Sequence, residues 1–168
     1  NILKEHDRYI ISNGKEGKRA DLSRTNLWRA NLYEANLREA NLCGANLNRA
    51  DLSRAKGVPF IPLACPETGS FIGYKEASGY IVELEILSDA KRCSGTSRGC
   101  RCDCAKVLSI SLPSGRRSKR LSVSSDYDHS FIYTVGEIVS VNDFDNDRWN
   151  ECSTGIHFFI NRREAVDY

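Results

Sequence analysis

Residues 20 to 54 consist of seven consecutive five-residue units, each a small residue, then Asn or Asp, then Leu, then two variable residues. This period fits neither common element. On an α-helix, five residues advance the chain by about 500°, so the leucines would spiral around it. On a strand, residues five apart point to opposite faces. All leucines can face one interior only if the chain bends around one corner per unit. This pattern predicts a four-sided solenoid in which each side is one unit.

This segment resembles the pentapeptide-repeat family, whose members form a right-handed quadrilateral β-helix. The resemblance implies that the leucines fill the axis, the small residues point inward at the corners, and the last two residues of each unit face solvent. The Asn and Asp side chains are expected to bond the turning backbone or to stack in ladders. With four units per turn, residue i lies beneath residue i+20, which predicts an ion pair between Glu34 and Arg54. Trp28 and Tyr33 fall exposed on neighbouring sides.

Seven units make fewer than two turns, whereas solenoids need about three repeats for stability. The coil ends therefore need covers. Residues 1–19 are expected to form an N-terminal cap, as a strand or a short helix. Phe60, Ile61 and Leu63 are expected to fold back over the open end, and a second copy of the chain is a further candidate cover, which predicts a homo-oligomer.

The remaining sequence has a different character. Residues 58–67 contain three of the four prolines and are expected to form an extended linker. From residue 68 to residue 168 a period of two predicts a mostly-β domain. A capping-box pattern at Asn161 and Glu164 predicts a terminal helix running to Asp167. The strands are expected at residues 70–75, 80–86, 105–112, 121–124, 131–134, 137–141 and 156–160.

The predicted fold class is therefore mainly β. A pentapeptide-repeat β-helix of under two coils, at residues 20–57, is followed by the small mostly-β domain with its C-terminal helix. That second domain, through segments such as residues 71–75, 148–152 and 155–159, resembles an uncharacterised domain that often follows pentapeptide repeats. Because that domain occurs in phage and bacterial proteins, the resemblance implies a phage or prophage setting, and it implies no activity.

A loop at Ser94–Gly99 carries hydroxyls, amides and an arginine, with further arginines beside it. Backbone N–H groups and arginine side chains suit phosphate, although no Walker or dinucleotide fingerprint is present. A solvated loop is the alternative. We expect a site for an anionic, nucleotide-like small molecule at Arg92, Arg98, Arg101, His157 and Tyr74. A second basic cluster, in a predicted hairpin loop, is either a soluble tip or a phosphate contact: Arg116, Arg117, Lys119 and Arg120.

The cysteine pattern raises the question of a metal. Cys100, Cys102 and Cys104 alternate, and Cys93 lies nearby, so four thiols are available for zinc. Along a straight strand, alternate sulfur atoms lie about 6.6–7 Å apart, which is too far for one ion. We therefore expect free thiols and neither a metal nor a cofactor.

Three functions remain open. The first is a non-enzymatic, phage-type binding protein that sequesters an anionic small molecule such as an immune-signalling nucleotide. The second is a protein-interaction or assembly module that acts through Trp28, Tyr33 and the coil surface. The third is a small enzyme that uses His157 with Cys152 or Glu151.

Net charge and hydropathy limit the classes of partner and the cellular location that we expect. The net charge of +2 does not by itself predict nucleic-acid binding. The absence of an apolar run of 18 residues argues against a membrane span, and no secretory signal precedes the repeats. We therefore expect a cytoplasmic protein, in the host cytoplasm if phage-encoded.

Overall fold

The computed structural model describes residues 2–168 and divides the chain into two compact units. Unit 1 consists of the described residues up to Pro62 together with residues 95–97 and 147–151. Unit 2 consists of Leu63–Ser94, Arg98–Asn146 and Cys152–Tyr168. The protein is mainly β, as the sequence predicts.

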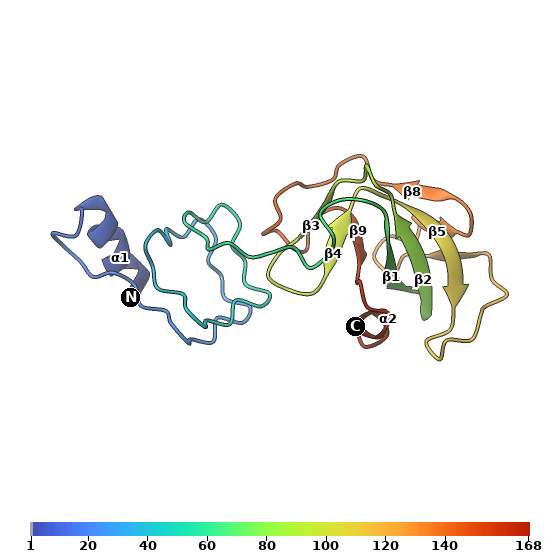
Figure 1. Cartoon of the computed structure of the whole chain (residues 1–168), viewed down its shortest axis with the longest axis horizontal. Helices are drawn as coiled ribbons and strands as arrows, with labels where there is room; N and C mark the ends of the chain where they lie inside the picture. Colours follow the sequence, from blue (N-terminus) through green and yellow to red (C-terminus); the bar gives the residue numbers. More distant parts are fainter. Residues whose placement is uncertain (1) are drawn as a thin grey trace. The chain divides into compact units, whose positions relative to one another are not determined.

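The repeat region of unit 1 forms the predicted four-sided coil (Figure 1). Parallel bridges join residues exactly one turn apart, at spacings of 20 residues, as between Asp21 and Asn41. The backbone N–H of Leu22 donates to the Asn41 carbonyl at 2.8 Å, and the N–H of Asn41 donates to the Ala20 carbonyl at 3.0 Å. The remaining bridges are Asn26 with Asn46, Asn31 with Asp51, and Asn36 with Lys56.

Each corner of the coil depends on a residue with left-handed backbone geometry. The fifth residue of every unit has a positive φ, from 55° at Arg24 to 70° at Gly44. The corner is closed by a backbone hydrogen bond to the carbonyl of the preceding leucine, as from Ala35 to Leu32 at 3.0 Å. This geometry corresponds to a type II turn. A non-glycine residue in this conformation costs about 1–2 kcal/mol, so the corners need compensating contacts.

The Asn and Asp side chains supply these contacts. In all seven units the side-chain oxygen accepts the backbone N–H two residues later, at 2.9–3.3 Å. The same side chains also form ladders, since the Asn41 amide donates to Asp21 and the Asn46 amide donates to Asn26, both at 3.1 Å. Both expected roles of these residues are therefore present together.

The coil interior is apolar and partly closed. The leucines Leu22, Leu32, Leu37 and Leu52 are buried, as are Ala20 and Ala50. The other leucines, Leu27, Leu42 and Leu47, are only half-buried. With fewer than two stacked turns, some interior positions lack a neighbour on one side.

The chain itself covers part of the coil. Helix α1 (Ile2–Ile11) lies beside it (Figure 1), with Leu3 packed against the apolar interior. Trp149, within the segment 147–151 of unit 1, packs against the same cluster. The expectation that Phe60 folds back over the coil is wrong, because its side chain is 87% exposed. Leu63 packs against the core of unit 2 instead, and the prolines before it keep the segment extended.

Unit 2 contains three antiparallel sheets. The largest has the order β1-β2-β5-β8, formed by Phe71–Ala77, Tyr80–Ile86, Cys104–Ser111 and Ile138–Ser140. The second has the order β3-β4-β9, formed by Arg92–Ser94, Cys100–Cys102 and Ile156–Phe158. The third pairs β6 (Ser122–Ser124) with β7 (Ile132–Thr134), and the short helix α2 spans Arg162–Val166.

The three sheets share one apolar core. It contains Val82, Leu84, Val107, Tyr133 and Phe158, all buried. A backbone bridge between Tyr74 and Phe159 connects β1 to the end of β9. None of the helices within residues 2–168 is long and apolar enough to span a membrane.

Two local features differ from the sequence-based expectation. The alternating cysteines do not share one straight strand, because the chain leaves one sheet after Cys102 and enters another at Cys104. Asp103 lies at this break, where its carboxylate accepts the Lys91 N–H at 2.9 Å. At α2, Asn161 caps the helix, but Glu164 pairs with Arg98 at 2.8 Å rather than completing a capping box.

Candidate functional site

The arginines predicted to bind an anion make contacts within the protein. Arg92 donates to five backbone carbonyls, including Gly69 at 2.8 Å and Leu87 at 2.6 Å. Its guanidinium also lies 5.1 Å from the centre of the Phe71 ring. The side chain therefore joins the segment before β1 to the turn before β3.

Arg101 is buried, with 3% of its surface exposed. It donates to the carbonyls of Thr154 at 2.7 Å and Asp145 at 3.2 Å. The register pairs Arg101 with His157, and pairs Arg92 with Cys102. Because paired residues share a face and consecutive residues alternate, Arg101 and His157 lie on one face of this sheet and Arg92 on the other.

The other predicted ligand residues are also engaged. Arg98 forms an ion pair with Glu164, whose hydrogen bond raises the pKa of the guanidinium above its ordinary value. Tyr74 is half-buried, and its backbone pairs with Phe159. His157 is exposed, and its Nε2 lies 3.0 Å from the Ser153 carbonyl. Since a carbonyl only accepts, this nitrogen is the donor in the hydrogen bond.

Glu151, Cys100 and Cys102, considered for catalysis or metal binding, make contacts within the protein. The Glu151 carboxylate accepts hydrogen bonds from the Thr96 hydroxyl at 2.8 Å and from the backbone N–H groups of Thr96 and Ser97. A hydrogen bond with Cys65 and burial raise the pKa of the Cys100 thiol, and burial raises that of Cys102. Within residues 2–168, no group of three or more His, Cys, Asp or Glu side chains is placed to hold a metal ion.

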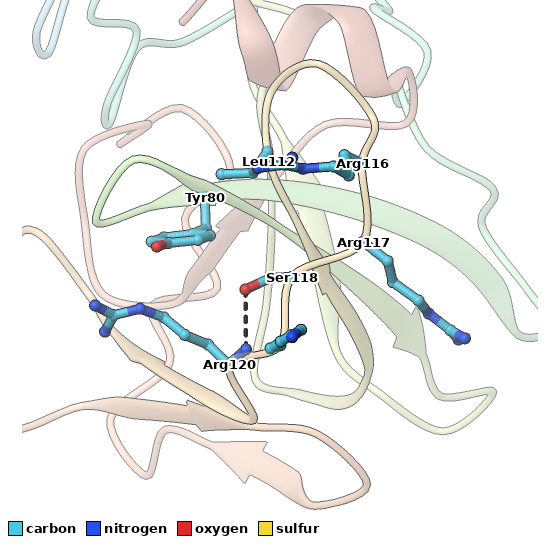
Figure 2. A pocket seen from close by; sticks show the side chains of 7 residues that line it. Tyr80, Leu112, Arg116, Arg117, Ser118 and Arg120 are labelled. Carbon is cyan, nitrogen blue, oxygen red and sulfur yellow. Dashed lines mark hydrogen bonds between the residues drawn. The ribbon is translucent and has the colours of Figure 1, made fainter.

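The second basic cluster lines a pocket in unit 2. The pocket has a volume of about 490 Å³ and lies at the loop that follows β5, beside Tyr80 at the start of β2 (Figure 2). The guanidinium of Arg120 lies 5.4 Å from the centre of the Tyr80 ring. Figure 2 shows Arg117 extending away from Tyr80 and Arg120. The lining cations are Arg116, Arg117, Lys119 and Arg120, and all four side chains are exposed.

The backbone of this loop is held in place by hydrogen bonds. The N–H of Leu112 donates to the Arg116 carbonyl at 2.8 Å, and the N–H of Ser118 donates to the Ile110 carbonyl at 3.0 Å. Arg162 of α2 donates to the carbonyls of Leu112 at 2.7 Å and Pro113 at 3.1 Å. The loop therefore presents its cations from a defined backbone.

A second candidate surface lies on the coil. Trp28 and Tyr33 are 50% and 45% exposed. The guanidinium of Arg29 lies 4.5 Å from the centre of the Trp28 ring, and that of Arg54 lies 5.7 Å from the centre of the Tyr33 ring. Arg54 also pairs with Glu34 at 3.3 Å, which confirms the predicted ion pair. A hydrogen bond to Glu34 raises the pKa of Tyr33 above its ordinary value.

Sequence reasoning missed three residues that matter for these surfaces. His6 and Trp149 contact the coil. The sequence gives little indication of either contact, because His6 is a single polar residue on a short helix and Trp149 lies far from the repeats along the chain. Tyr80 begins the predicted strand 80–86, is half-buried and lines the basic pocket. Its position next to the hairpin turn is the available signal, because a strand end is less covered than its centre.

Comparison of the chain with curated proteins and with solved structures gave no match. A family model described as pentapeptide repeats (8 copies) matches residues 20–56, and a second, described as a family of unknown function, matches residues 61–165. The second match covers more than half of the 168 residues. The chain therefore belongs to the family of unknown function DUF5758 and carries a pentapeptide-repeat region ahead of that domain.

Proposed function

We propose that this chain is a non-enzymatic protein-interaction module, with the coil surface around Trp28 and Tyr33 as its contact surface. The combination of a pentapeptide-repeat region with a DUF5758 domain supports a module of this kind. The observation that carries the proposal is the pair of exposed aromatic rings, each with an arginine over it. Trp, Tyr and Arg are the residue types that dominate binding energy at protein interfaces.

The partner is a protein surface that carries carboxylates. In the repeats, five arginines (Arg24, Arg29, Arg38, Arg49 and Arg54) stand against four carboxylates (Asp21, Glu34, Glu39 and Asp51). A partner with acidic groups is therefore attracted to the coil and steered toward it. The contacts among Tyr33, Glu34 and Arg54 hold these side chains before binding, which lowers the ordering cost on association.

The nucleotide-sequestering function stays a prediction, as does a phage origin. The donors of Arg92 and Arg101 already bond backbone carbonyls, so the residues first predicted for that ligand give this function little support. A second copy of the chain is a less supported partner, because α1 and Trp149 already cover parts of the coil.

The test is quantitative capture from a lysate of the organism that encodes the chain. The immobilised wild type is compared with a Trp28→Ala/Tyr33→Ala variant and with a Tyr127→Ala/Tyr168→Ala control, which removes two exposed aromatic rings from unit 2. The proposal requires a protein that cross-links to the coil, is kept by the control and is lost by the coil variant. The purified partner should then bind the coil variant at least about tenfold more weakly.

Capture that is equal for the coil variant and the wild type contradicts the proposal. Light scattering of the purified chain addresses the competing partner. A dimer that dissociates on Trp28→Ala/Tyr33→Ala would replace the acidic partner by a second copy of the chain.

A further inference from the structure

We propose that the basic pocket beside Tyr80 binds a nucleoside polyphosphate, a ligand with a planar base and two or more phosphates. This site is separate from the coil surface and does not depend on the proposed protein partner. The structure supports it through charge, a held backbone, an aromatic ring and size.

The charge of the pocket is concentrated and unpaired. Four of the five residues from Arg116 to Arg120 are cationic. The ion pairs Arg8–Glu5, Arg54–Glu34, Arg98–Glu164 and Arg163–Asp167 all involve other residues. The pocket lining contains no carboxylate. Neighbouring like charges repel one another, and an anion with several charges relieves that repulsion.

The backbone under these cations is fixed before a ligand arrives. Arg117 forms a backbone bridge with Ser111, and Arg162 holds the loop through the carbonyls of Leu112 and Pro113. The N–H of Arg120 donates to the Ser118 hydroxyl at 3.0 Å, as Figure 2 shows. Binding therefore has to order only the arginine and lysine side chains, and not the loop.

The ring of Tyr80 distinguishes the expected ligand from a bare phosphate. Tyr80 lines the pocket, and Arg120 lies over its ring. An aromatic side chain and a guanidinium plane are the groups on which a base stacks, while arginine forks bind phosphate oxygens. A nucleoside polyphosphate uses both at once.

The size of the pocket favours a small ligand over a nucleic acid. Its volume of about 490 Å³ is within the range typical of small-molecule sites. The four cations come from one short loop, and the net charge of the whole chain is only +2. A nucleic-acid surface has an extended basic stripe that follows the phosphate backbone.

The test is calorimetric titration of the full chain with ATP, ADP, AMP, inorganic tripolyphosphate and a single-stranded oligonucleotide, at physiological ionic strength. We expect ATP to bind, and ADP to bind more weakly. We expect AMP and tripolyphosphate each to bind at least about tenfold more weakly than ATP, because one lacks phosphates and the other lacks a base.

Variants locate the site. Arg120→Gln and Tyr80→Ala should each weaken ATP binding at least about fivefold, whereas Tyr80→Phe keeps the ring and should bind within about twofold of the wild type. Lys91→Gln is the matched control, since Lys91 is an exposed cation of unit 2 outside the pocket. It should also stay within about twofold. Circular dichroism melting of each variant checks that unit 2 remains folded.

Four results would overturn the proposal. They are no ATP binding at millimolar concentration, tripolyphosphate binding as tight as ATP binding, an oligonucleotide that binds more tightly than ATP, or an equal loss of affinity in Lys91→Gln and Arg120→Gln. The second result would identify a simple polyphosphate site, and the third would identify a nucleic-acid surface.

Discussion

The Nδ1 atom of the buried His6 accepts the backbone N–H of Ala20 at 3.0 Å. Because a backbone N–H only donates, Nδ1 carries no proton, and the proton is on Nε2. Nε2 then donates to the Arg38 carbonyl at 2.9 Å. The backbone bridges of the coil give no partner to this N–H or to this carbonyl, which both belong to its first turn. One imidazole on α1 therefore satisfies a backbone donor and a backbone acceptor of the coil.

Replacement of His6 by alanine should destabilise unit 1 by about 2 kcal/mol or more, because the Ala20 N–H and the Arg38 carbonyl both lose a buried partner. Urea unfolding followed by tryptophan fluorescence measures this, since both tryptophans, Trp28 and Trp149, lie in unit 1. Asp7→Ala, at the adjacent exposed position, is the control and should change stability by less than about 0.5 kcal/mol. Equal midpoints for His6→Ala and Asp7→Ala would show that the imidazole does not hold α1 to the coil.

Gly57 should be intolerant of a side chain. It stands at the leucine position of an eighth unit, with a φ of 70°, and an added Cβ would lie 2.5 Å from the Arg38 backbone. Gly57→Ala should therefore cost about 3 kcal/mol. Gly44 has the same φ, but an added Cβ meets only the Arg24 side chain at 3.5 Å. Gly44→Ala should cost about 1 kcal/mol, and a larger loss at Gly44 than at Gly57 in urea unfolding would contradict this geometry.

The ion pair between Glu34 and Arg54 should contribute little stability. Both side chains are largely exposed at a separation of 3.3 Å. A double-mutant cycle with Glu34→Gln and Arg54→Gln should give a coupling energy of about 0.2–1 kcal/mol, which decreases at high salt. A coupling well above this range, unchanged by salt, would mean that the charges are shielded from water.

Lys75 should make the stability of unit 2 depend on pH. Burial lowers the pKa of its amine below the ordinary 10.5. Between the lowered pKa and 10.5 the unfolded chain binds more protons, so this group makes stability rise with pH across that window. Lys75→Met should raise the melting temperature at pH 7 and remove this increase toward alkaline pH. The difference between the wild-type and variant melting temperatures, measured from pH 7 to 10, should therefore shrink; a constant difference would show that the amine is solvated.

The coil was predictable because its signal is local and repeated. Each unit contains its own leucine, its own Asx side chain and its own corner, so the interior, the ladder and the pairing of Glu34 with Arg54 follow from the spacing. In unit 2, alternation likewise located most strands, and the strand Tyr80–Ile86 has its predicted bounds.

The candidate sites were harder to predict because they depend on pairing between distant segments. The sequence gives no register, so it did not show that Arg92 and Arg101 face opposite sides of one sheet. Nor does it show that an arginine already donates to carbonyls far along the chain, as Arg101 does to Thr154. The basic cluster from Arg116 to Arg120 was visible, but its neighbour Tyr80 comes from another strand.

The pairing of Asp21 with Asn41 also sets a rule for the length of this coil. Twenty inserted residues add one complete turn, so each later residue stays on the same side of the square. Five residues inserted between Arg38 and Gly57 would move Gly57, which lies against the Arg38 backbone at the end of the coil, to the next side of the square. Only insertions in multiples of four units leave the chain departing from the same side.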